Sequence, residues 1–338
     1  MDSSRRSRLT PAIADVRRAV RAVLPAPRAE PAGTVVLVAL SGGPDSLALA
    51  AATAFEAARA GIRAGAVVVD HGLQSGSADV AARAANKARS LGLDPVLVRM
   101  AVVDSAGGPE AAARIARYAA LDEAAGETGA VLVLLGHTLD DQAETVLLGL
   151  ARGSGPTSLH GMSPLTSSES GAAYARPLLG IRRSSTLQFC EDSGLEPWID
   201  PHNTDPSFAR VRVRETVLPL LERELGPGIA EALARTAEQL REDSDALDRF
   251  AEELTEELAE LAESGISLPV QALASNPSAL RQRLIRLAVE GEFHVSLSRS
   301  QTLDVSRLIT HWHGQKALDL PGVRVERRGS LLIFTANG

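Results

Sequence analysis

The sequence predicts an α/β protein that begins with a doubly wound parallel sheet domain and ends with a smaller helical and α+β region. Between residues 34 and 150, short apolar segments alternate with helical segments, which is typical of βαβ units whose helices cover both faces of the sheet. After Gly226 this alternation stops, and a long amphipathic segment rich in Glu and Leu follows. The length of 338 residues fits about two domains of ~150 residues each.

The elements of the first domain are predicted from the spacing of their apolar residues. Four short segments rich in Val, Leu and Ala are the predicted strands: residues 34–40, 66–70, 95–100 and 130–136. Longer segments are the predicted helices: residues 46–59, 77–91, 110–125, 139–150 and 184–193. The Gly-, Ser- and Pro-rich stretch 151–175 is predicted to be a long loop.

The two ends of the chain differ from this domain. Residues 1–30 carry seven arginines against three acidic residues, and we expect a basic, mobile N-terminal arm with one short helix at 11–24. We place the α/β domain at residues 31–216 and a C-terminal region at 217–338. The expected elements of that region are a long helix at 229–262, a helix at 279–289 and a small hairpin formed by 315–320 and 323–335.

Charge, cysteine content and hydropathy restrict the class of protein. The net charge of −7 argues against a protein that coats nucleic acid through bulk charge, although local basic patches are compatible with it. A single cysteine, Cys190, excludes an intramolecular disulfide and a cysteine metal cluster, as expected in a reducing cytoplasm. The longest apolar run, residues 130–135, is far shorter than the ~20 residues of a membrane-spanning helix. We therefore expect a cytoplasmic protein that does not enter the membrane.

A glycine-rich turn joins the first predicted strand to the first predicted helix, and it reads Ser41-Gly42-Gly43-Pro44-Asp45-Ser46. Its glycines let the backbone approach a ligand, and the helix N-terminus supplies free N–H groups, which together suit a phosphate. It is not a Walker A loop, because no Gly-Lys-Ser/Thr follows. The carboxylate of Asp45 would repel phosphate unless a cation such as Mg²⁺ lies between them. The alternative is a tight turn in which Asp45 or Ser46 only caps the helix.

A second polar segment, residues 136–145, follows the fourth predicted strand. Asp141 and Glu144 are three residues apart on one face of the predicted helix, and His137 precedes that helix. Carboxylates beside an anion site suit the binding and deprotonation of an amine nucleophile. Alternatively, Thr138 and Asp141 form a capping box and serve the helix alone.

These segments together resemble a known family. The glycine-rich turn resembles the pyrophosphate loop of the N-type ATP pyrophosphatases. Further segments are similar to the tRNA(Ile)-lysidine synthetase family, in the family's order, over about residues 34–220. They are Val69-Asp-His-Gly-Leu73, Glu110-Ala-Ala-Ala-Arg-Ile-Ala-Arg-Tyr118, Gly136-His-Thr-Leu-Asp-Asp-Gln-Ala-Glu-Thr145, Arg152-Gly-Ser-Gly155, Arg176-Pro-Leu-Leu179 and Asp200-Pro-His-Asn203.

The resemblance implies a Rossmann-like sheet domain of the adenine nucleotide alpha hydrolase type and an ATP-dependent ligase that modifies tRNA. In the family, ATP adenylates the C2 oxygen of the wobble cytidine of tRNA(Ile) with the CAU anticodon, and pyrophosphate leaves. The ε-amine of free L-lysine then attacks C2, and AMP leaves, which gives lysidine. The implied cofactors are ATP and Mg²⁺, the implied partners are this tRNA and L-lysine, and a homodimer is compatible with the resemblance.

The resemblance also implies roles for individual residues. The implied catalytic residues are Asp45, Arg114, Asp141 and Glu144. Asp141 is the expected base and Glu144 the expected amine ligand, because a lysine ammonium with a pKa of ~10.4 must lose a proton before it attacks. The implied ATP contacts are Ser41, Gly42, Gly43, Pro44, Asp45, Ser46, Asp70, His71, Arg114, His137 and Arg212, with Asp45 as the Mg²⁺ ligand. The implied tRNA contacts are Arg176, Arg210 and Arg214.

Structural alternatives exist for some of these arginines. Arg114 follows Glu110 by four residues and would form a surface ion pair with it on a helix. Residues 210–214 place three arginines at alternating positions, where they share one face of an extended segment but spread apart on a helix. The family usually has Asn at the position of Val211, so this stretch departs from the family pattern.

Other functions use a similar loop. The thiolation of tRNA needs paired cysteines to carry sulfur or an iron–sulfur cluster, and this sequence has one cysteine. Amide-forming relatives take ammonia from a glutaminase domain, and the sequence contains no such domain. A third alternative is a protein that binds ATP and tRNA without chemistry, and the presence of Asp45, Asp141 and Glu144 argues against it.

Overall fold

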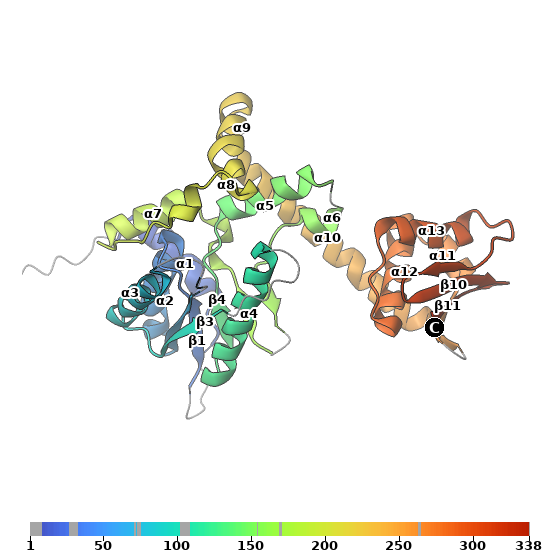
Figure 1. The fold of residues 1–338 in the computed structure, drawn as a ribbon, viewed down its shortest axis with the longest axis horizontal. Helices are drawn as coiled ribbons and strands as arrows, with labels where there is room; N and C mark the ends of the chain where they lie inside the picture. Colours follow the sequence, from blue (N-terminus) through green and yellow to red (C-terminus); the bar gives the residue numbers. More distant parts are fainter. Residues whose placement is uncertain are drawn as a thin grey trace, which may run out of the picture. The chain divides into compact units, whose positions relative to one another are not determined.

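The computed structural model describes residues 9–26, 33–70, 72, 76–101, 109–153, 155–168, 171–262 and 265–337 (Figure 1). The chain divides into two compact units, residues 1–238 and 239–338, and each is described by itself. The domain boundaries expected from the sequence, after residues 30 and 216, stay predictions. No helix in the described part of the chain is long and apolar enough to cross a membrane.

The first unit is built on a mostly parallel sheet, as the alternating apolar segments predict. Among the described residues the strand order is β3 (Val96–Met100), β2 (Arg63–Asp70), β1 (Val35–Ala39), β4 (Leu132–Leu134), β6 (Ala173–Ala175) and β5 (Leu165–Ser167). β5 is antiparallel to β6 at the edge, and the other pairs are parallel. The chain runs outward from β1 through β2 to β3, and then crosses to β4 on the other side of β1. Ligands of open α/β sheets bind at such a reversal, beyond the carboxyl ends of the strands.

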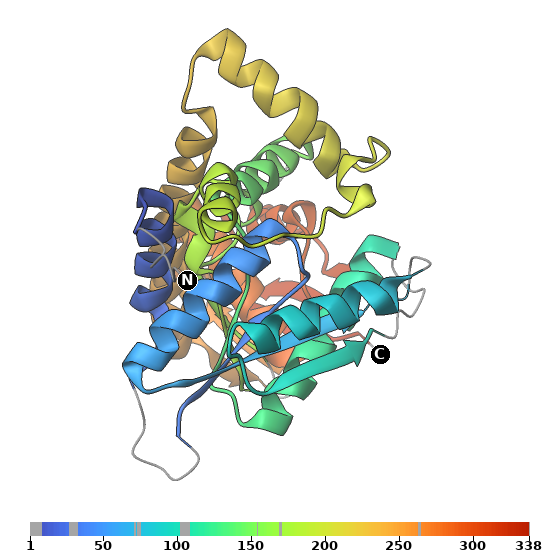
Figure 2. The ribbon, with the colours of Figure 1, turned by 90° about the vertical axis from the view of Figure 1, so that its left-hand side faces the viewer.

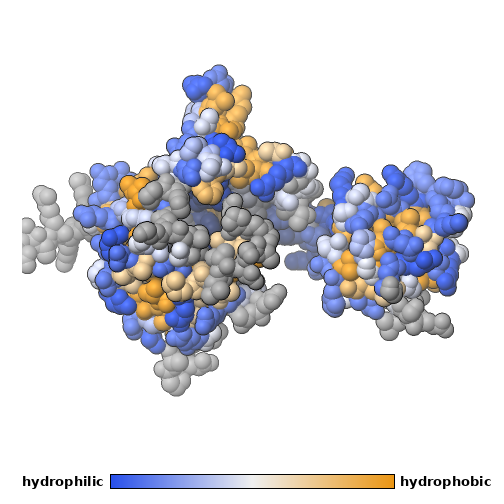
Figure 3. Space-filling model, viewed as in Figure 1, coloured by the Kyte–Doolittle hydropathy of each residue, from blue (hydrophilic) through white to orange (hydrophobic). Residues whose placement is uncertain are grey.

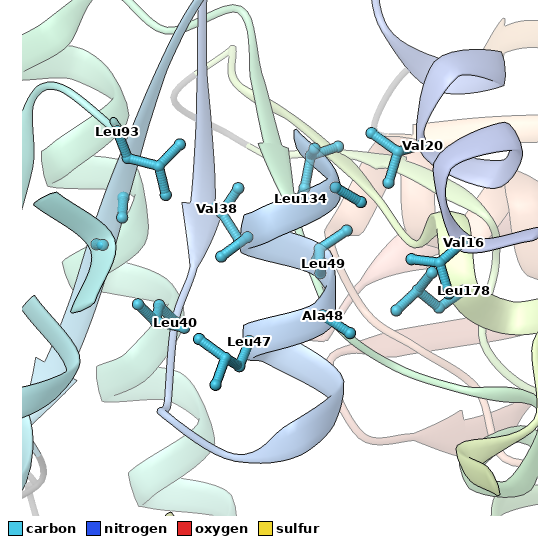
Figure 4. Packing of buried hydrophobic residues seen from close by; sticks show 14 of the residues in the cluster. Val16, Val20, Val38, Leu40, Leu47, Ala48, Leu49, Leu93, Leu134 and Leu178 are labelled. Carbon is cyan, nitrogen blue, oxygen red and sulfur yellow. The ribbon is translucent and has the colours of Figure 1, made fainter. Parts of the chain in front are cut away.

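Helices cover both faces of this sheet (Figures 1 and 2). One face carries α1 (Pro11–Val23), α2 (Pro44–Ala60), α3 (Ser77–Ser90) and α7 (Arg183–Asp192), and α4 (Pro109–Thr128) covers the other. β1 is buried on both sides, because Val36 and Val38 join the cluster of α2 whereas Val35 and Leu37 join the cluster of α4. Figure 4 shows Val38 of β1 and Leu47 of α2 within this packing.

Helix α1 belongs to this core. Thr10 caps its N-terminus, because the hydroxyl of Thr10 accepts a hydrogen bond from the backbone N–H of Ile13. Ile13, Val16 and Val20 are buried, and the helix packs on α2 and α7. The expectation of a mobile arm is therefore wrong for residues 9–26, because the apolar face of an amphipathic helix gains free energy by leaving water. The rest of the expected arm lies outside the described residues.

The stretch 151–175, predicted to be a loop, extends the sheet instead. It contains the short helix α6 (Pro156–Leu159) and the strands β5 and β6. β6 pairs with β4, and Tyr174 at its centre is buried. Strands of three residues are too short to show an alternating pattern, so pairing with a neighbouring strand decides their structure.

The basic segment 210–214 is helical, and the extended alternative is wrong. α8 (Ala209–Arg212) continues into η3 (Val213–Val217), a π-helical turn, and then into α9 (Leu218–Leu225). Because a helix has ~3.6 residues per turn, Arg210 and Arg214 lie on one side of the segment and Arg212 on another.

Helix α5 (Leu139–Ala151) follows β4 and anchors the remaining helices of the first unit. It shares an apolar cluster with η3, α9 and the start of α10 (Ile229–Leu258), made of Leu139, Ala143, Val213, Leu218 and Ala230. Leu220 and Leu225 of α9 are exposed, and Figure 3 shows apolar surface over this helix.

The second unit is a small α+β domain. Its antiparallel sheet has, among the described residues, the order β7 (Glu260–Ala262), β8 (Gly265–Pro269), β11 (Leu331–Ala336), β10 (Val323–Arg328) and β9 (Leu318–Leu320). The end of α10 packs in the same core as α11 (Val270–Ser275), α12 (Ser278–Phe293) and α13 (Arg299–Thr310). The predicted terminal hairpin is present as the meander of β9, β10 and β11, whereas β7, β8, α11 and α13 were not predicted.

The burial of α1 gives a stability prediction. Ile13→Ala should lower the free energy of unfolding by about 2–5 kcal/mol, because it removes a buried side chain and leaves a cavity. Leu9→Ala is the matched control, since Leu9 is 66 % exposed, and its effect should stay within about 0.5 kcal/mol. Urea denaturation of the full chain measures both. Equal unfolding midpoints for the two variants would mean that α1 contributes nothing to the core.

Candidate active site

The glycine-rich turn is held by the side chain of Ser46. The Ser46 hydroxyl accepts the Ser41 N–H at 3.2 Å, donates to the Gly43 carbonyl at 3.0 Å and lies 3.0 Å from the Ser41 hydroxyl. Gly42 has a φ of 87°, a left-handed conformation that favours glycine. Gly43 is the N-cap of α2, and no side chain in the described chain caps the helix there. The turn thus leaves the first N–H groups of α2 available to an anion, and the alternative of a capping role alone does not hold.

The second polar segment touches this turn directly. A Cβ atom placed on Gly136 would lie 3.1 Å from the Ser46 nitrogen and 3.2 Å from its Cα atom. The end of β4 therefore approaches the first turn of α2 as closely as a glycine allows. This approach brings the two polar segments to one side of the sheet, at the reversal of strand order.

A cleft of about 700 Å³ opens at this edge of the sheet. Residues of both segments line it, among them Ser41, Asp45, His137 and Asp141. Asp70 at the end of β2 also lines the cleft and accepts the Gly72 N–H at 2.9 Å. His71, expected to contact ATP, lies outside the described residues.

Three carboxylates converge on Arg183, which lines the cleft. Nε of Arg183 donates to Asp45 at 3.3 Å, Nη2 donates to Asp141 at 2.6 Å, and Nη1 donates to Glu144 at 3.3 Å. Glu144 is fully buried and also accepts from Arg214 at 2.7 and 3.0 Å. Burial alone would lower the pKa of Arg183, but the three carboxylates raise it above its ordinary value. Arg183 is therefore a permanent cation that balances the acidic cluster.

Asp141 serves its helix and the cleft at the same time. Its Oδ2 accepts the N–H of Thr138 at 2.8 Å and the Thr138 hydroxyl at 2.9 Å, which completes the capping box at the start of α5. Its Oδ1 accepts from Arg183 and, at 3.4 Å, from Arg214. Burial raises the pKa of this carboxyl, but Arg183 and the Thr138 donors outweigh it and hold the pKa below its usual range. The two interpretations of this segment are thus compatible.

Asp45 and His137 have unusual environments. Burial raises the pKa of Asp45 despite hydrogen bonds from Thr186 and Arg183. His137 also lines the cleft, and its Nδ1 is buried without a hydrogen-bond partner among the described residues. Burial, with the nearby positive charge of Arg117, lowers the pKa of His137 to about 3. His137 is therefore a neutral imidazole at pH 7.

The structure brings some of the predicted arginines to the cleft and not others. Arg210 and Arg214 line it, and both approach Glu144. Arg212 instead donates to the carbonyls of Pro206 and Ser207, each at 2.7 Å, outside the described cleft lining. This placement follows from the helical conformation of the segment.

The other two predicted arginines also lie outside the described cleft lining. Arg176 is 5 % exposed and donates to the Ser163 carbonyl and the Tyr118 hydroxyl, so its expected role as a tRNA contact is not supported. Arg114 is exposed, and its guanidinium lies 5.0 Å from the centre of the Tyr118 ring. Arg117, one turn further along α4, lines the cleft in its place.

Sequence reasoning missed Arg183, Arg117 and Trp198. Arg183 is the first residue of α7, and its backbone N–H donates to Asp140 at 2.7 Å, which fixes the start of that helix beside α5. The backbone N–H of Trp198 donates to the Gly42 carbonyl at 2.9 Å and so supports the turn. Arg117 was visible in the sequence as the second arginine of its segment, but only the fold shows which of the two faces the cleft.

Comparison with known proteins agrees with this geometry. Residues 16–221 match the PP-loop domain family, and residues 268–331 match the TilS substrate binding domain family. The chain is 62 % identical to the tRNA(Ile)-lysidine synthase of Leifsonia xyli subsp. xyli over 328 residues, which cover 94 % of this chain and 97 % of the relative. It is 52 % identical to that of Thermobifida fusca over 320 residues, 94 % of this chain and 95 % of the relative.

A solved structure supports the fold alone. It is the U34-tRNA thiolase NcsA from Methanococcus maripaludis with its 4Fe-4S cluster, at a TM-score of 0.56 and 21 % identity. The match covers 68 % of this chain and 80 % of the thiolase.

The environment of His137 gives a prediction about pH. Because the pKa of His137 is about 3 in the folded protein and near 6.5 in the unfolded chain, the unfolded chain binds more protons between these values. The free energy of unfolding should therefore fall as the pH falls from about 6.5 toward 3. His137→Gln should remove part of this dependence, measured as urea midpoints at pH 7.0 and 4.5.

An NMR titration tests the same point directly. The His137 imidazole signals, assigned by their loss in His137→Gln, should not shift between pH 5 and 8. A His137 signal that titrates near pH 6.5 would contradict the burial seen here.

Proposed function

The chain belongs to the tRNA(Ile)-lysidine synthase family, and on that premise we propose that it uses ATP to join free L-lysine to C2 of the wobble cytidine of tRNA(Ile) with the CAU anticodon, in the cytoplasm. One observation carries the proposal. A turn suited to phosphate and a buried pair of carboxylates, Asp141 and Glu144, border the same Arg183 at the carboxyl ends of β1 and β4. Adenylation and attack by an amine need these two kinds of group within one cleft.

The glycine-rich turn is the proposed site of the ATP phosphates. The N–H groups at the start of α2 and the hydroxyl of Ser41 can donate to phosphate oxygens, and the helix dipole favours negative charge there. Arg117 and the neutral His137 border the same cleft and can donate to, or accept from, the nucleotide. These groups stabilise the charge that develops on pyrophosphate as it leaves.

Asp45 is the proposed Mg²⁺ ligand, together with the phosphates of ATP. Among the described residues no group of three or more Asp, Glu, His or Cys side chains could hold a metal ion. Mg²⁺ commonly takes one or two carboxylates and completes its coordination with phosphate oxygens and water. Asp45 in the first turn of α2 fits that requirement. When bound, the metal would neutralise charge on the phosphates.

Asp141 and Glu144 are the proposed acceptors of the lysine ε-amine. Glu144 is buried at the end of the cluster and can bind the ammonium group, while Oδ1 of Asp141 faces the cleft and can take its proton. Oδ2 of Asp141 stays on Thr138, so the carboxylate keeps its orientation during the reaction. The neutral amine then has the lone pair that attack on C2 requires.

Contacts with tRNA are proposed in both units. Arg210 and Arg214 border the cleft and can approach the wobble nucleotide. The second unit matches the TilS substrate binding domain family, and its Arg327 lies 5.2 Å from the centre of the Trp312 ring. An arginine beside an aromatic ring can bind phosphate and stack on a base.

A homodimer is a further part of the proposal. It is supported by exposed apolar side chains on and beside α9, namely Val217, Leu220 and Leu225. Surfaces of this kind commonly mark protein interfaces.

The properties of Cys190 disfavour thiolation, the main rival. It is the one cysteine in the sequence, and burial together with Asp45 raises the pKa of its thiol to about 11. Sulfur transfer requires a thiolate, which a buried thiol of this kind does not supply at pH 7.

Incubation with ATP, radiolabelled lysine and total tRNA tests the proposed function. We expect the label in one nucleoside after digestion of the tRNA, and we expect pyrophosphate release to require tRNA. A protein that only binds ATP would release no pyrophosphate. An enzyme that uses ammonia would leave the labelled lysine in solution.

Single substitutions should separate the two chemical steps. Asp141→Asn should slow lysidine formation by about 10²–10⁴-fold through loss of the base, while single-turnover pyrophosphate release stays within about tenfold. Asp45→Asn should instead reduce pyrophosphate release itself. Asp94→Asn, an exposed carboxylate of the same unit, is the control and should change neither rate. Equal loss of both steps in Asp141→Asn would contradict the assignment of the base.

A further inference from the structure

Arg183 occupies the place where the proposed function puts two incoming cations. Each nitrogen of its guanidinium serves a different carboxylate, from Asp45 on α2 and from Asp141 and Glu144 on α5. The proposed function assigns Asp45 to Mg²⁺ and the other two carboxylates to the lysine ε-ammonium. With Arg183 in this position, both cations meet carboxylates that already have a guanidinium partner, and Arg214 pairs with Asp141 and Glu144 as well.

The same side chain stands between two cavities. The large cleft is lined by Asp45 and Asp141, and a smaller cavity of about 130 Å³ is lined by Glu144. Arg183 lines both of them, as does Arg214. A movement of the Arg183 guanidinium would therefore change the charge and the access of both cavities together.

The backbone of Arg183 is fixed, so its side chain is the part that can move. Asp140 holds its backbone N–H at 2.7 Å, and the helix that it begins is packed in the core through Phe189 and Cys190. The side chain is 19 % exposed and points along the floor toward the first turn of α2. A phosphate bound at that turn would lie next to Asp45, the carboxylate that Nε of Arg183 already contacts at 3.3 Å.

Phosphate is a strong competitor for this guanidinium. Arginine binds phosphate oxygens in a bidentate manner, and a triphosphate carries more negative charge than the single carboxylates that it would replace. We propose that Arg183 couples the two substrate sites: phosphates at the glycine-rich turn draw its guanidinium away from Asp141 and Glu144. These two carboxylates keep Arg214 as a partner and bind the lysine ε-ammonium in the place of Arg183. This inference rests on the proposed function, and it makes Arg183 a positioning residue.

The coupling has two consequences. ATP and lysine should bind with positive cooperativity, and by linkage each should raise the affinity for the other by the same factor. In addition, Asp141 should become a stronger base once Arg183 leaves it, because the nearby positive charge favours the deprotonated carboxylate. The base would thus be activated only when ATP is in place.

Equilibrium dialysis of radiolabelled lysine against the full chain tests the coupling. The affinity for lysine is measured without nucleotide, with α,β-methylene ATP and Mg²⁺, and with adenosine, which carries no phosphate. We expect the analogue to tighten lysine binding by at least about fivefold. Adenosine should leave it unchanged. Equal effects of the two ligands, or no effect of the analogue, would overturn the proposal.

Variants identify the residue responsible. Arg183→Gln should bind lysine at least as tightly as the wild type without nucleotide, and its coupling factor should fall below about twofold. Arg63→Gln is the control, because Arg63 is exposed, pairs with Asp94 and lies outside the described lining of both cavities, and it should keep the wild-type factor. A folded Arg183→Gln protein with the wild-type coupling factor would overturn the proposal.

Two further measurements keep the result interpretable. Melting curves show whether Arg183→Gln folds, and if it does not, the wild-type comparison of analogue with adenosine decides alone. Lysine incorporation into tRNA by the wild type is measured in parallel. Incorporation without coupling rejects only the role of Arg183, whereas absence of lysine binding and of incorporation rejects the proposed function itself.

Discussion

The active-site cleft depends on the compensation of three clustered carboxylates, two of them buried, by Arg183 together with Arg214. An uncompensated buried charge costs about several kcal/mol, so Asp45, Asp141 and Glu144 can lie together only if a cation lies among them. Arg183 meets this need with one nitrogen for each carboxylate. It can do so because Asp140 fixes the start of α7 beside α5. One electrostatic requirement thus links α2, α5 and α7 beside the cleft that Arg183 lines.

The contact between Gly136 and the first turn of α2 sets the distance between the proposed phosphate site and the acidic side chains of α5. Because a Cβ atom at Gly136 would meet the backbone of Ser46 at 3.1 Å, a larger residue would push the end of β4 away from the turn. Glycine at this position therefore keeps the phosphate site and Asp141 within one cleft. The strand order reverses between β1 and β4, so the connections that follow these two strands leave the sheet in opposite directions. This divergence opens the crevice at the carboxyl ends of β1 and β4.

Several polar groups here have a structural and a chemical role together. Asp141 uses one carboxylate oxygen for the capping box of α5 and the other for the cleft, and Ser46, in the first turn of α2, holds the glycine-rich turn. Such double use explains why local pattern alone left a capping role and a catalytic role open for the same residues. A cap and a ligand site both need a polar side chain at a helix N-terminus, so the sequence signals coincide.

The sequence by itself determined the parallel sheet, the succession of its first four strands and their helices along the chain, and the two polar segments at the strand ends. These features follow from the spacing of apolar residues and from turn-forming residues, which are local properties of the sequence. It also pointed to the family through those segments. Only the tertiary structure decided that α1 joins the core, that β5 and β6 extend the sheet, and that residues 210–214 are helical. It alone brought Arg183 to the carboxylates, turned Arg117 rather than Arg114 toward the cleft, and buried Arg176. These outcomes depend on which surfaces meet after folding. Arg183 and its carboxylate partners are 39 to 138 residues apart in the chain, so no local sequence pattern predicts that they pair.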